Sequence, residues 1–227
     1  ELVDSASIAR DERKGDGPSD HVPVVVDLIR EDDDDDRPMI GNERRQIMNT
    51  SPDVTANLTG GLTADEFKEA FRHHPAGVVV ITADAGDGPV GLTASSVFSV
   101  SAEPALLVFS VGNQASAAQT LLKADTLVLH MLLDAQLPLA KLCSTHGVDR
   151  FADTTLWDRL PTGEPFFHNV PARIRGKVIS KTPAGSSTIF LVHALESEIA
   201  EDCSTAKPLV YYNRGWHGLS EASKLEG

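Results

Sequence analysis

One predicted β-strand, over residues 90–101, carries a row of hydroxyl groups that could bind a ligand. Side chains alternate between the two faces of a strand, so one face of this strand carries Thr93, Ser95, Ser99 and Ser101. Their hydroxyl groups could donate hydrogen bonds to a bound anion or heterocycle. The same pattern also fits a half-exposed sheet face whose Thr and Ser side chains meet water. The pattern alone leaves both interpretations open.

A second possible binding element follows the next predicted strand, residues 105–111. The sequence GNQAS, residues 112–116, leads into a predicted helix, and either Asn113 or Ser116 could cap its N-terminus. Free N–H groups and the helix dipole favour anions at such a terminus. Every helix of this kind needs a cap, so the motif is weak by itself. Next to a hydroxyl-bearing strand, it predicts a phosphate-binding corner.

The elements that would position these residues are mostly short strands. Runs of β-branched and aromatic residues between turn residues predict strands over residues 77–83, 90–101, 105–111, 126–133, 172–180, 187–195 and 208–212. Hairpin turns are predicted at residues 86–88 and 183–185. Helices are few: Thr63 and Glu66 have the spacing of a capping box, and residues 135–142 predict another helix. Because strands and helices do not alternate regularly, we expect a mainly β fold, a closed or nearly closed antiparallel barrel.

The charge of the chain limits its partners. The formal net charge is −13 and the pI about 4.9. An acidic chain without a basic stripe is unsuited to nucleic acids, whose phosphates must be neutralised, and to an anionic membrane surface. No apolar run is long enough to predict a transmembrane helix, and no secretory signal is visible. We therefore expect a cytoplasmic protein.

Composition also divides the chain. Residues 1–60 are polar and acidic, and they predict a flexible N-terminal extension in which only residues 22–29 could form a short strand. The five aspartates at residues 32–36 lack the ligand spacing of a calcium loop, so we interpret them as a solvated acidic run. Residues 61–220 form the predicted barrel domain, and residues 221–227 a C-terminal tail.

Common catalytic motifs are missing: GxSxG, HExxH, a P-loop, and GxGxxG after a strand. The eight histidines and two cysteines show no metal-ligand spacing. Cys143 and His146 are close in sequence, but nucleophilic pairs are normally assembled from distant segments. His130, within a predicted strand, fits a core or edge position. A β-barrel without an obvious protein nucleophile or base suits a bound organic cofactor that supplies the chemistry.

Several segments, in order, resemble the flavin reductase family, the FMN-binding split-barrel reductases of two-component monooxygenases. They are FKEAFRHHPAGVVVITA, GLTASSVFSVSAEPALLVFSV, NQASAAQTL, DRF and PLVYYNRGWHGL, within residues 67–219. The resemblance implies a six-stranded antiparallel Greek-key barrel, usually a homodimer with flavin near the subunit interface. It also implies that FMN or FAD accepts a hydride from NADH or NADPH and then leaves, reduced, for a partner monooxygenase.

The resemblance also assigns a flavin site, position by position. Its residues are Thr93, Ala94, Ser95, Ser96, Asn113, Ser116, Arg150 and Phe151. The first four would line the flavin ring and ribityl chain, and Asn113 and Ser116 match the phosphate corner. Arg150 and Phe151 match a loop pair near the cofactor. Arg150 could neutralise the phosphate through a bidentate contact, or it could form only a surface salt bridge.

One position departs from the family pattern. Many members carry Gly-Asp-His at a turn, where the His helps to place the nicotinamide, whereas this sequence has Gly185, Ser186 and Ser187. Flavin binding is therefore better supported than nicotinamide-dependent turnover. Two alternatives stay open: a flavin- or haem-binding split-barrel protein without efficient turnover, and an interaction module that works through its acidic extension.

Overall fold

The computed structural model describes residues 6–8, 24–26, 58–200 and 207–225 of the chain. The chain forms two compact units, Glu1–Met48 and Asn49–Gly227. In the first unit, the short strands β1 (Ala6–Ile8) and β2 (Val24–Val26) pair in antiparallel orientation. Strand β2 lies within residues 22–29, where the sequence allowed a short strand, but β1 lies where the sequence indicated none.

Some predictions fall on other parts of the chain. The acidic run at residues 32–36 and Cys203 lie outside the described residues. The flexible extension predicted for residues 1–60 stays a prediction. Among the described residues, no helix has both the length and the apolar character needed to span a membrane.

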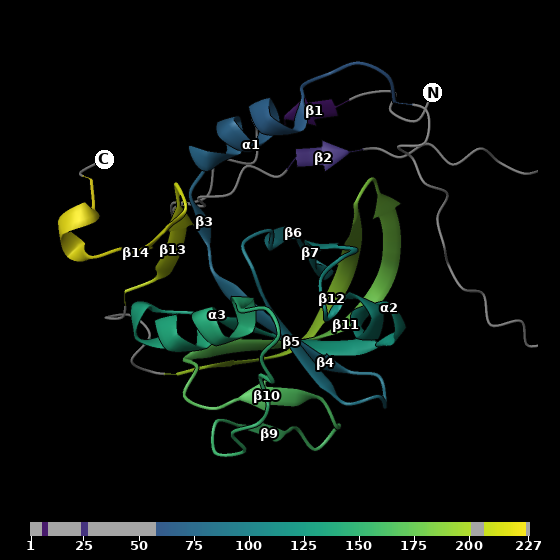
Figure 1. Ribbon diagram of the computed structural model, residues 1–227, viewed down its shortest axis with the longest axis vertical. Helices are drawn as coiled ribbons and strands as arrows, with labels where there is room; N and C mark the ends of the chain where they lie inside the picture. Colours follow the sequence, from purple (N-terminus) through teal and green to yellow (C-terminus); the bar gives the residue numbers. More distant parts are fainter. Residues whose placement is uncertain (1–5, 9–23, 27–57, 201–206, 226–227) are drawn as a thin grey trace, which may run out of the picture. The chain divides into compact units, whose positions relative to one another are not determined.

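The second unit is built on a seven-stranded antiparallel sheet with the strand order β5-β4-β8-β11-β12-β7-β6 (Figure 1). Its strands are β4 (Val79–Asp84), β5 (Pro89–Ala94), β6 (Phe98–Ala102), β7 (Ala105–Gly112), β8 (Thr126–Met131), β11 (Ala172–Ala184) and β12 (Ser187–Ile199). The β4–β5 and β11–β12 hairpins turn through Gly86, Gly88 and Gly185, all at positive φ, a conformation that costs glycine little. These are the two hairpin turns that the sequence predicts.

The single strand predicted over residues 90–101 is wrong, because the chain bends at residues 95–97. Its two halves, β5 and β6, form the opposite edges of the sheet, so this bend joins the edges and the sheet curls on itself. Ser96, in the bend, donates to the carbonyl of Ser110 on β7 (3.0 Å) and accepts from the Ser110 N–H (3.2 Å). If β5 and β6 are counted as one bent strand, the sheet has the six strands expected of a split barrel.

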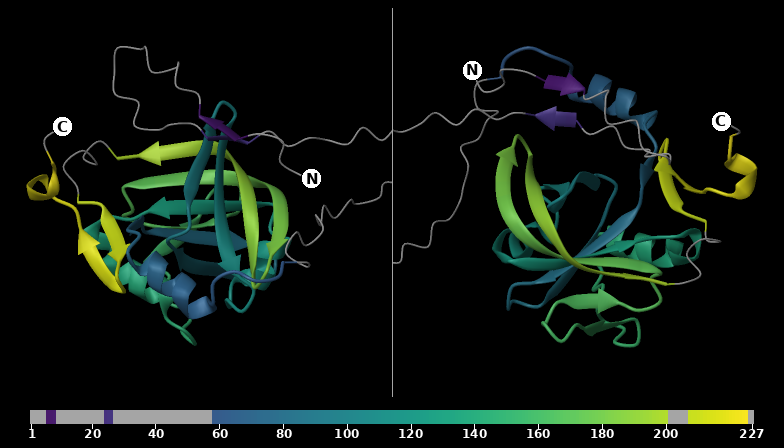
Figure 2. Two further views of the ribbon diagram at one scale, coloured as in Figure 1. Left: turned by 90° about the horizontal axis from the view of Figure 1, so that it is seen from above. Right: turned by 180° about the vertical axis from the view of Figure 1, so that it is seen from behind.

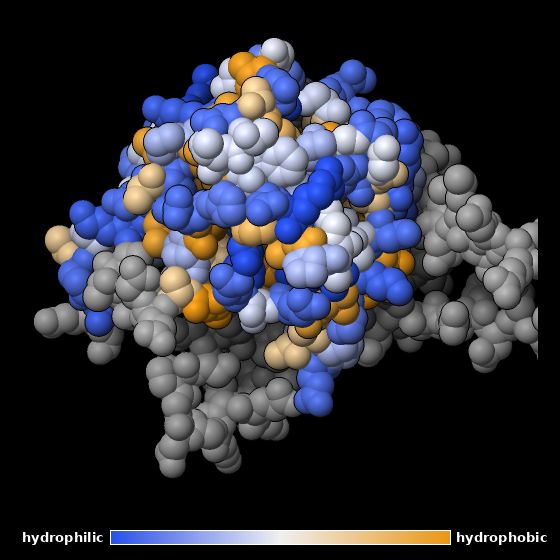
Figure 3. Space-filling model, turned by 90° about the horizontal axis from the view of Figure 1, so that it is seen from below, coloured by the Kyte–Doolittle hydropathy of each residue, from blue (hydrophilic) through white to orange (hydrophobic). Residues whose placement is uncertain are grey.

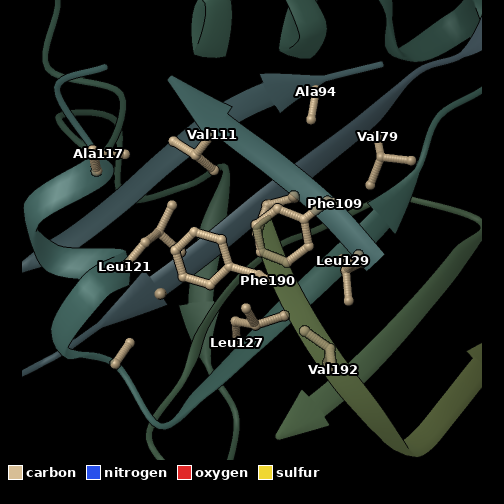
Figure 4. Packing of buried hydrophobic residues seen from close by; sticks show 14 of the residues in the cluster. Val79, Ala94, Phe109, Val111, Ala117, Leu121, Leu127, Leu129, Phe190 and Val192 are labelled. Atoms are coloured by element: carbon tan, nitrogen blue, oxygen red, sulfur yellow. The ribbon is translucent and has the colours of Figure 1, made fainter. Parts of the chain in front are cut away.

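The core lies inside the curled sheet. Along β7 the side chains of Leu107, Phe109 and Val111 are buried and alternate with more exposed neighbours, as expected for a strand with one face inward. Phe109 stacks on Phe190 of β12, with ring centroids 4.8 Å apart. Figure 4 shows these two rings side by side, with Leu121 of helix α2 (Ala118–Lys123) packed next to them.

A second apolar cluster lies between the sheet and helix α3 (Leu137–Ser144), which follows a short 3-10 turn, η2 (Asp134–Gln136). It includes Phe151 and Phe167, stacked at 5.1 Å. Phe167 ends the hairpin of β9 (Trp157–Arg159) and β10 (Pro165–Phe167). The sequence did not predict this hairpin, because its strands are too short to show a period.

The remaining elements extend from the barrel. Helix α1 (Ala64–Arg72) begins with the predicted capping box at Thr63, and none of its residues is buried. A small sheet has the order β14-β13-β3, and its strands are β3 (Ala76–Gly77), β13 (Leu209–Tyr212) and β14 (Gly215–Gly218), followed by a 3-10 turn, η4 (Glu221–Ser223). Both views in Figure 2 show the strong curvature of the long β11–β12 hairpin, which forms the middle of the main sheet. The mainly β fold with a few short helices is thus confirmed.

Candidate functional site

The bend between β5 and β6 presents one free hydroxyl group. Ser95 is exposed, and its hydroxyl group forms no hydrogen bond within the described residues. Thr93, by contrast, is half-buried and donates its Oγ1 to the backbone carbonyl of Ala140 in α3 at 2.7 Å, and Ala94 is 7% exposed. The hydroxyl row predicted from alternation is therefore interrupted, and Ser95 is the member of residues 93–96 that remains available to a ligand.

The turn after β7 is held against the β11–β12 hairpin. The backbone N–H of Asn113 donates to the Ser186 carbonyl at 2.9 Å. The Asn113 Oδ1 accepts from the Thr188 hydroxyl at 3.1 Å. The two segments that the sequence linked to phosphate and to nicotinamide, residues 112–116 and 185–187, are therefore neighbours.

The predicted helix cap is wrong. Helix α2 has Ala117 at its N-cap position, and no side chain caps it. Ser116 instead accepts a hydrogen bond from Arg150, and the Asn113 side-chain oxygen accepts one from the Thr188 hydroxyl. The groups of this corner that could meet an anion are therefore Arg150 and the Ser116 hydroxyl rather than a capped helix terminus.

Arg150 connects three segments. Its Nε donates to the Cys143 carbonyl (3.1 Å), its Nη2 to the Thr145 carbonyl (3.0 Å), and its Nη1 to the Ser116 Oγ (3.2 Å). Thr145 is the C-cap residue of α3, so the guanidinium meets the negative end of that helix. The surface salt bridge considered for Arg150 is not formed with any described carboxylate, and its charge is available to an anion.

Phe151 and Cys143 belong to the core. The Phe151 side chain is 7% exposed and lies edge-on to Trp157 at 5.0 Å as well as against Phe167. Burial raises the pKa of the Cys143 thiol to about 12, although the nearby Arg150 opposes the shift. A thiol that stays protonated is a poor nucleophile, so Cys143 and the exposed His146 do not form a catalytic pair.

His130 is a neutral core histidine. Its Nδ1 lies 3.0 Å from the Val80 carbonyl, which can only accept, and its Nε2 accepts from the Phe167 N–H at 3.1 Å. These partners fix the tautomer with the proton on Nδ1. Burial, with a smaller contribution from the charge of Arg173, lowers the pKa of His130 to about 4, against the effect of the Val80 hydrogen bond. Of the core and edge positions that the sequence left open for His130, the structure shows the core position.

Two surface hollows of the described residues lie at the β9–β10 hairpin, away from the predicted site residues. Their volumes are about 330 and 290 Å³, both border Arg159 of the hairpin, and neither is lined by a predicted site residue. Figure 3 views the molecule from the hairpin side, where hydrophilic residues cover most of the surface and hydrophobic ones are scattered between them. Among the described residues, no cluster of His, Cys, Asp and Glu could hold a metal ion.

The structure adds α3 to the site. It brings Ser116 and Arg150 together directly, and it connects Thr93 and Arg150 through carbonyls of α3. The Ser96 hydroxyl is hydrogen-bonded to Ser110, and the Phe151 ring packs against Trp157 and Phe167. The sequence could not identify the carbonyls of Ala140 and Cys143 as partners, because every residue has a backbone carbonyl.

The curled antiparallel sheet with its few short helices has the split-barrel fold. Residues 71–220 match the family model described as "Flavin reductase like domain", and the chain belongs to this family. The predictions of an oxidoreductase and of a flavin reductase are thereby confirmed.

Three similar proteins illustrate the relationship. An NADH:FMN oxidoreductase of Rhodococcus qingshengii is 42% identical over 173 residues, which cover 72% of this chain and 88% of that protein. The reductase component of an FADH(2)-dependent resorcinol hydroxylase of a Rhizobium species is 29% identical over 170 residues, 73% of this chain and 93% of that one. The structure of a Streptomyces globisporus NADH:FAD oxidoreductase, in complex with NAD and FAD fragments, superposes with a TM-score of 0.64. It is 25% identical and covers 73% of this chain and 100% of that chain.

Proposed function

We propose that this protein transfers a hydride from NADH to FMN and delivers the reduced flavin to a partner flavin-dependent monooxygenase. The observation that carries the proposal is the 42% identity to an NADH:FMN oxidoreductase over 88% of its length. The partner is supported by the similarity to the reductase component of a hydroxylase. FAD and NADPH remain the alternative cofactors.

The described residues fit a planar anionic cofactor. Residues 93–96 would line the flavin, with the free Ser95 hydroxyl and the backbone groups of the bend as hydrogen-bond partners. The phosphate would lie at Asn113 and Ser116, beside the positive charge of Arg150. The Arg150 Nη1 atom lies 3.2 Å from the Ser116 Oγ. Phe151 would support the site from the core. When bound, flavin supplies the ring that accepts a hydride.

The chain's own contribution to the reaction is positioning. Hydride transfer requires the two rings to stack at about 3–3.5 Å, and orientation supplies most of the rate. The hydrogen bond between Asn113 and Ser186 holds the two predicted cofactor segments together, so the binding sites for the flavin and for the nicotinamide nucleotide would be neighbours. The serines at positions 186 and 187 favour the second candidate function, a flavin-binding protein with slow turnover.

We propose that the protein is a homodimer, formed through the outer face of β6, β7 and β12. Phe98, Val108 and Leu191 are cross-strand neighbours on the face opposite the core, and Phe98 is 50% exposed. Such a contiguous apolar face is typical of an interface. A second copy packed on this face, where Phe98 lies two residues after Ser96, would add side chains beside the proposed flavin site.

Size-exclusion chromatography with light scattering tests the dimer. Phe98→Asp should give a monomer that binds FMN more weakly. Leu156→Asp, at an exposed position in the loop before β9, should leave the dimer intact. A wild-type monomer would refute this part of the proposal. We further propose a cytoplasmic location, where NADH is available and the free Cys143 thiol stays reduced.

The reductase function is tested by adding FMN and NADH to the purified protein and following the loss of NADH absorbance. Turnover that depends on added FMN is the expected result. Bound flavin without NADH oxidation would refute the reductase and support the flavin-binding alternative. If flavin fluorescence is not quenched at all, only an interaction module is left.

A further inference from the structure

Helix α3 contacts both parts of the proposed flavin site through hydrogen bonds to its backbone. Thr93 Oγ1 donates to the Ala140 carbonyl at 2.7 Å, and Arg150 Nε donates to the Cys143 carbonyl at 3.1 Å. Ala140 and Cys143 are 0% and 2% exposed, so the inner face of α3 is fixed in the core. The helix is therefore a rigid element to which two otherwise separate segments are attached.

Strand β5 packs beside α3 and the Phe151 ring near this contact. A Cβ atom placed on Gly91, two residues before Thr93, would lie 3.5 Å from the Phe151 ring and 3.6 Å from the Cys143 sulfur. Strand β5, helix α3 and the loop that carries Arg150 thus meet in close contact. A shift of α3 would move residues 93–96 and the Arg150–Ser116 pair together.

The hydrogen bonds of Arg150 show how its charge is oriented. Three of its five N–H donors are spent on the carbonyls of Cys143 and Thr145 and on the Ser116 hydroxyl, so the guanidinium fork cannot turn without breaking these bonds. A lysine would keep the charge but has no fork with which to reach three acceptors. The structure uses the geometry of arginine at this position and not only its charge.

We propose that α3 is the strut that sets the distance between the two halves of the flavin site, with Thr93 and Arg150 acting as positioning residues at its two attachment points. This inference rests on the proposed flavin site. It goes beyond that proposal because it assigns Thr93 and Arg150 a role in binding the isoalloxazine ring as well as the phosphate. Loss of either attachment should therefore weaken binding of the isoalloxazine ring itself.

The test compares the dissociation constants of FMN and of riboflavin, which lacks the phosphate, measured by quenching of flavin fluorescence. Thr93→Val and Arg150→Met should weaken both ligands by about tenfold, the loss expected for one or two hydrogen bonds. Thr93→Ser, which keeps the hydroxyl group, should bind both flavins like the wild type, whereas Arg150→Lys should bind them as weakly as Arg150→Met. The double variant should lose less than the product of the two single losses, because both residues act through α3.

Two matched variants serve as controls. Arg159→Met removes an arginine that also donates to a backbone carbonyl, that of Gly163, but contacts neither α3 nor Ser116. Thr155→Val removes an exposed hydroxyl that contacts Asp153. Both should bind the two flavins like the wild type. Thermal unfolding of every variant separates loss of binding from loss of fold, and the milder Thr93→Val remains informative if Arg150→Met does not fold.

Several outcomes would overturn the proposed role of α3. If Arg150→Met weakens FMN but not riboflavin, and Arg150→Lys restores FMN, Arg150 is only a counter-charge for phosphate. Unchanged riboflavin binding in Thr93→Val would remove the other attachment point. The assay needs no NADH, so a wild-type protein that binds flavin without oxidising NADH would refute the reductase function and leave the strut standing. A wild type that binds neither flavin would refute the site and the strut together.

Discussion

The Nε2 atom of His130 accepts a hydrogen bond from the backbone N–H of Phe167 at 3.1 Å, and this contact fastens the β9–β10 hairpin to the main sheet. On its other side the same ring donates to the Val80 carbonyl. One fully buried imidazole thus joins β4, β8 and β10. Phe167 in turn stacks on Phe151, the residue that follows Arg150 in the sequence. The Phe151 ring also lies edge-on to Trp157. The packing therefore continues from His130 to the loop that carries Arg150.

This arrangement predicts a loss of stability in acid. The unfolded chain binds a proton at His130 near pH 6.5, whereas the folded protein resists it until about pH 4. Stability is therefore fully present above pH 6.5 and falls as the pH drops towards 4, by on the order of 3 kcal/mol from this group. Urea unfolding at pH 7.0, 5.5 and 4.5 measures it. His130→Gln should show a smaller loss over this window, and an equal loss would assign the effect to other groups.

Ser95 should be the site residue that can be changed without cost to the fold. Ser95→Leu is expected to weaken FMN binding at least tenfold with little change in melting temperature, because the position is exposed and its hydroxyl makes no described contact. Fluorescence titration measures the affinity. Ser197→Leu, at an exposed position on β12, is the control. Unchanged FMN affinity in Ser95→Leu would refute the placement of the flavin.

Ser96 should behave differently from its neighbour. Its hydroxyl both donates to and accepts from the Ser110 backbone, so Ser96→Leu removes the link between the bend and β7. We expect a loss of about 1–3 kcal/mol of stability along with weaker FMN binding. Denaturant unfolding tests it, and a variant as stable as Ser95→Leu would contradict the structural role.

The core pair Phe109–Phe190 should dominate stability. Phe190 is 1% exposed and stacks on Phe109, so Phe190→Ala should cost about 3–5 kcal/mol through lost burial and the cavity it leaves. The half-exposed Phe98 offers a contrast, since Phe98→Ala should cost far less in the isolated chain. Urea midpoints under identical conditions compare them. Similar losses at both positions would contradict the assignment of the core.

The turn at residues 185–187 should control the nicotinamide rather than the flavin. The double substitution Ser186→Asp and Ser187→His restores the residues common in the family, and we expect it to lower the KM for NADH severalfold without changing FMN affinity. Steady-state kinetics with varied NADH measures this. A changed FMN affinity with an unchanged KM for NADH would move the nicotinamide away from this turn.

The extension should be dispensable for the barrel. Removing residues 1–48 is expected to leave the melting temperature nearly unchanged, since β1 and β2 pair with each other and belong to a separate unit. Differential scanning calorimetry of the shortened protein checks this. A drop of many degrees would show that the first unit supports the barrel.

The local sequence determined most of the strands and one helix start in advance. The capping box at Thr63 and the glycines in the β4–β5 and β11–β12 turns are short-range signals, and they formed where predicted. Runs of β-branched and aromatic residues identified the strands β7 and β12. The buried histidine at position 130 was also predictable, because it lies within an apolar run.

Only the tertiary structure decided how the site residues are used. The bend at residues 95–97 separates hydroxyl groups that alternation had placed on one face, because closing the sheet requires β5 and β6 to pair with different strands. Ser116 meets Arg150 instead of capping α2, and Thr93 and Arg150 meet on the carbonyls of α3. These contacts join residues more than thirty positions apart or use backbone atoms common to every residue. No spacing of residues in the sequence could therefore predict them.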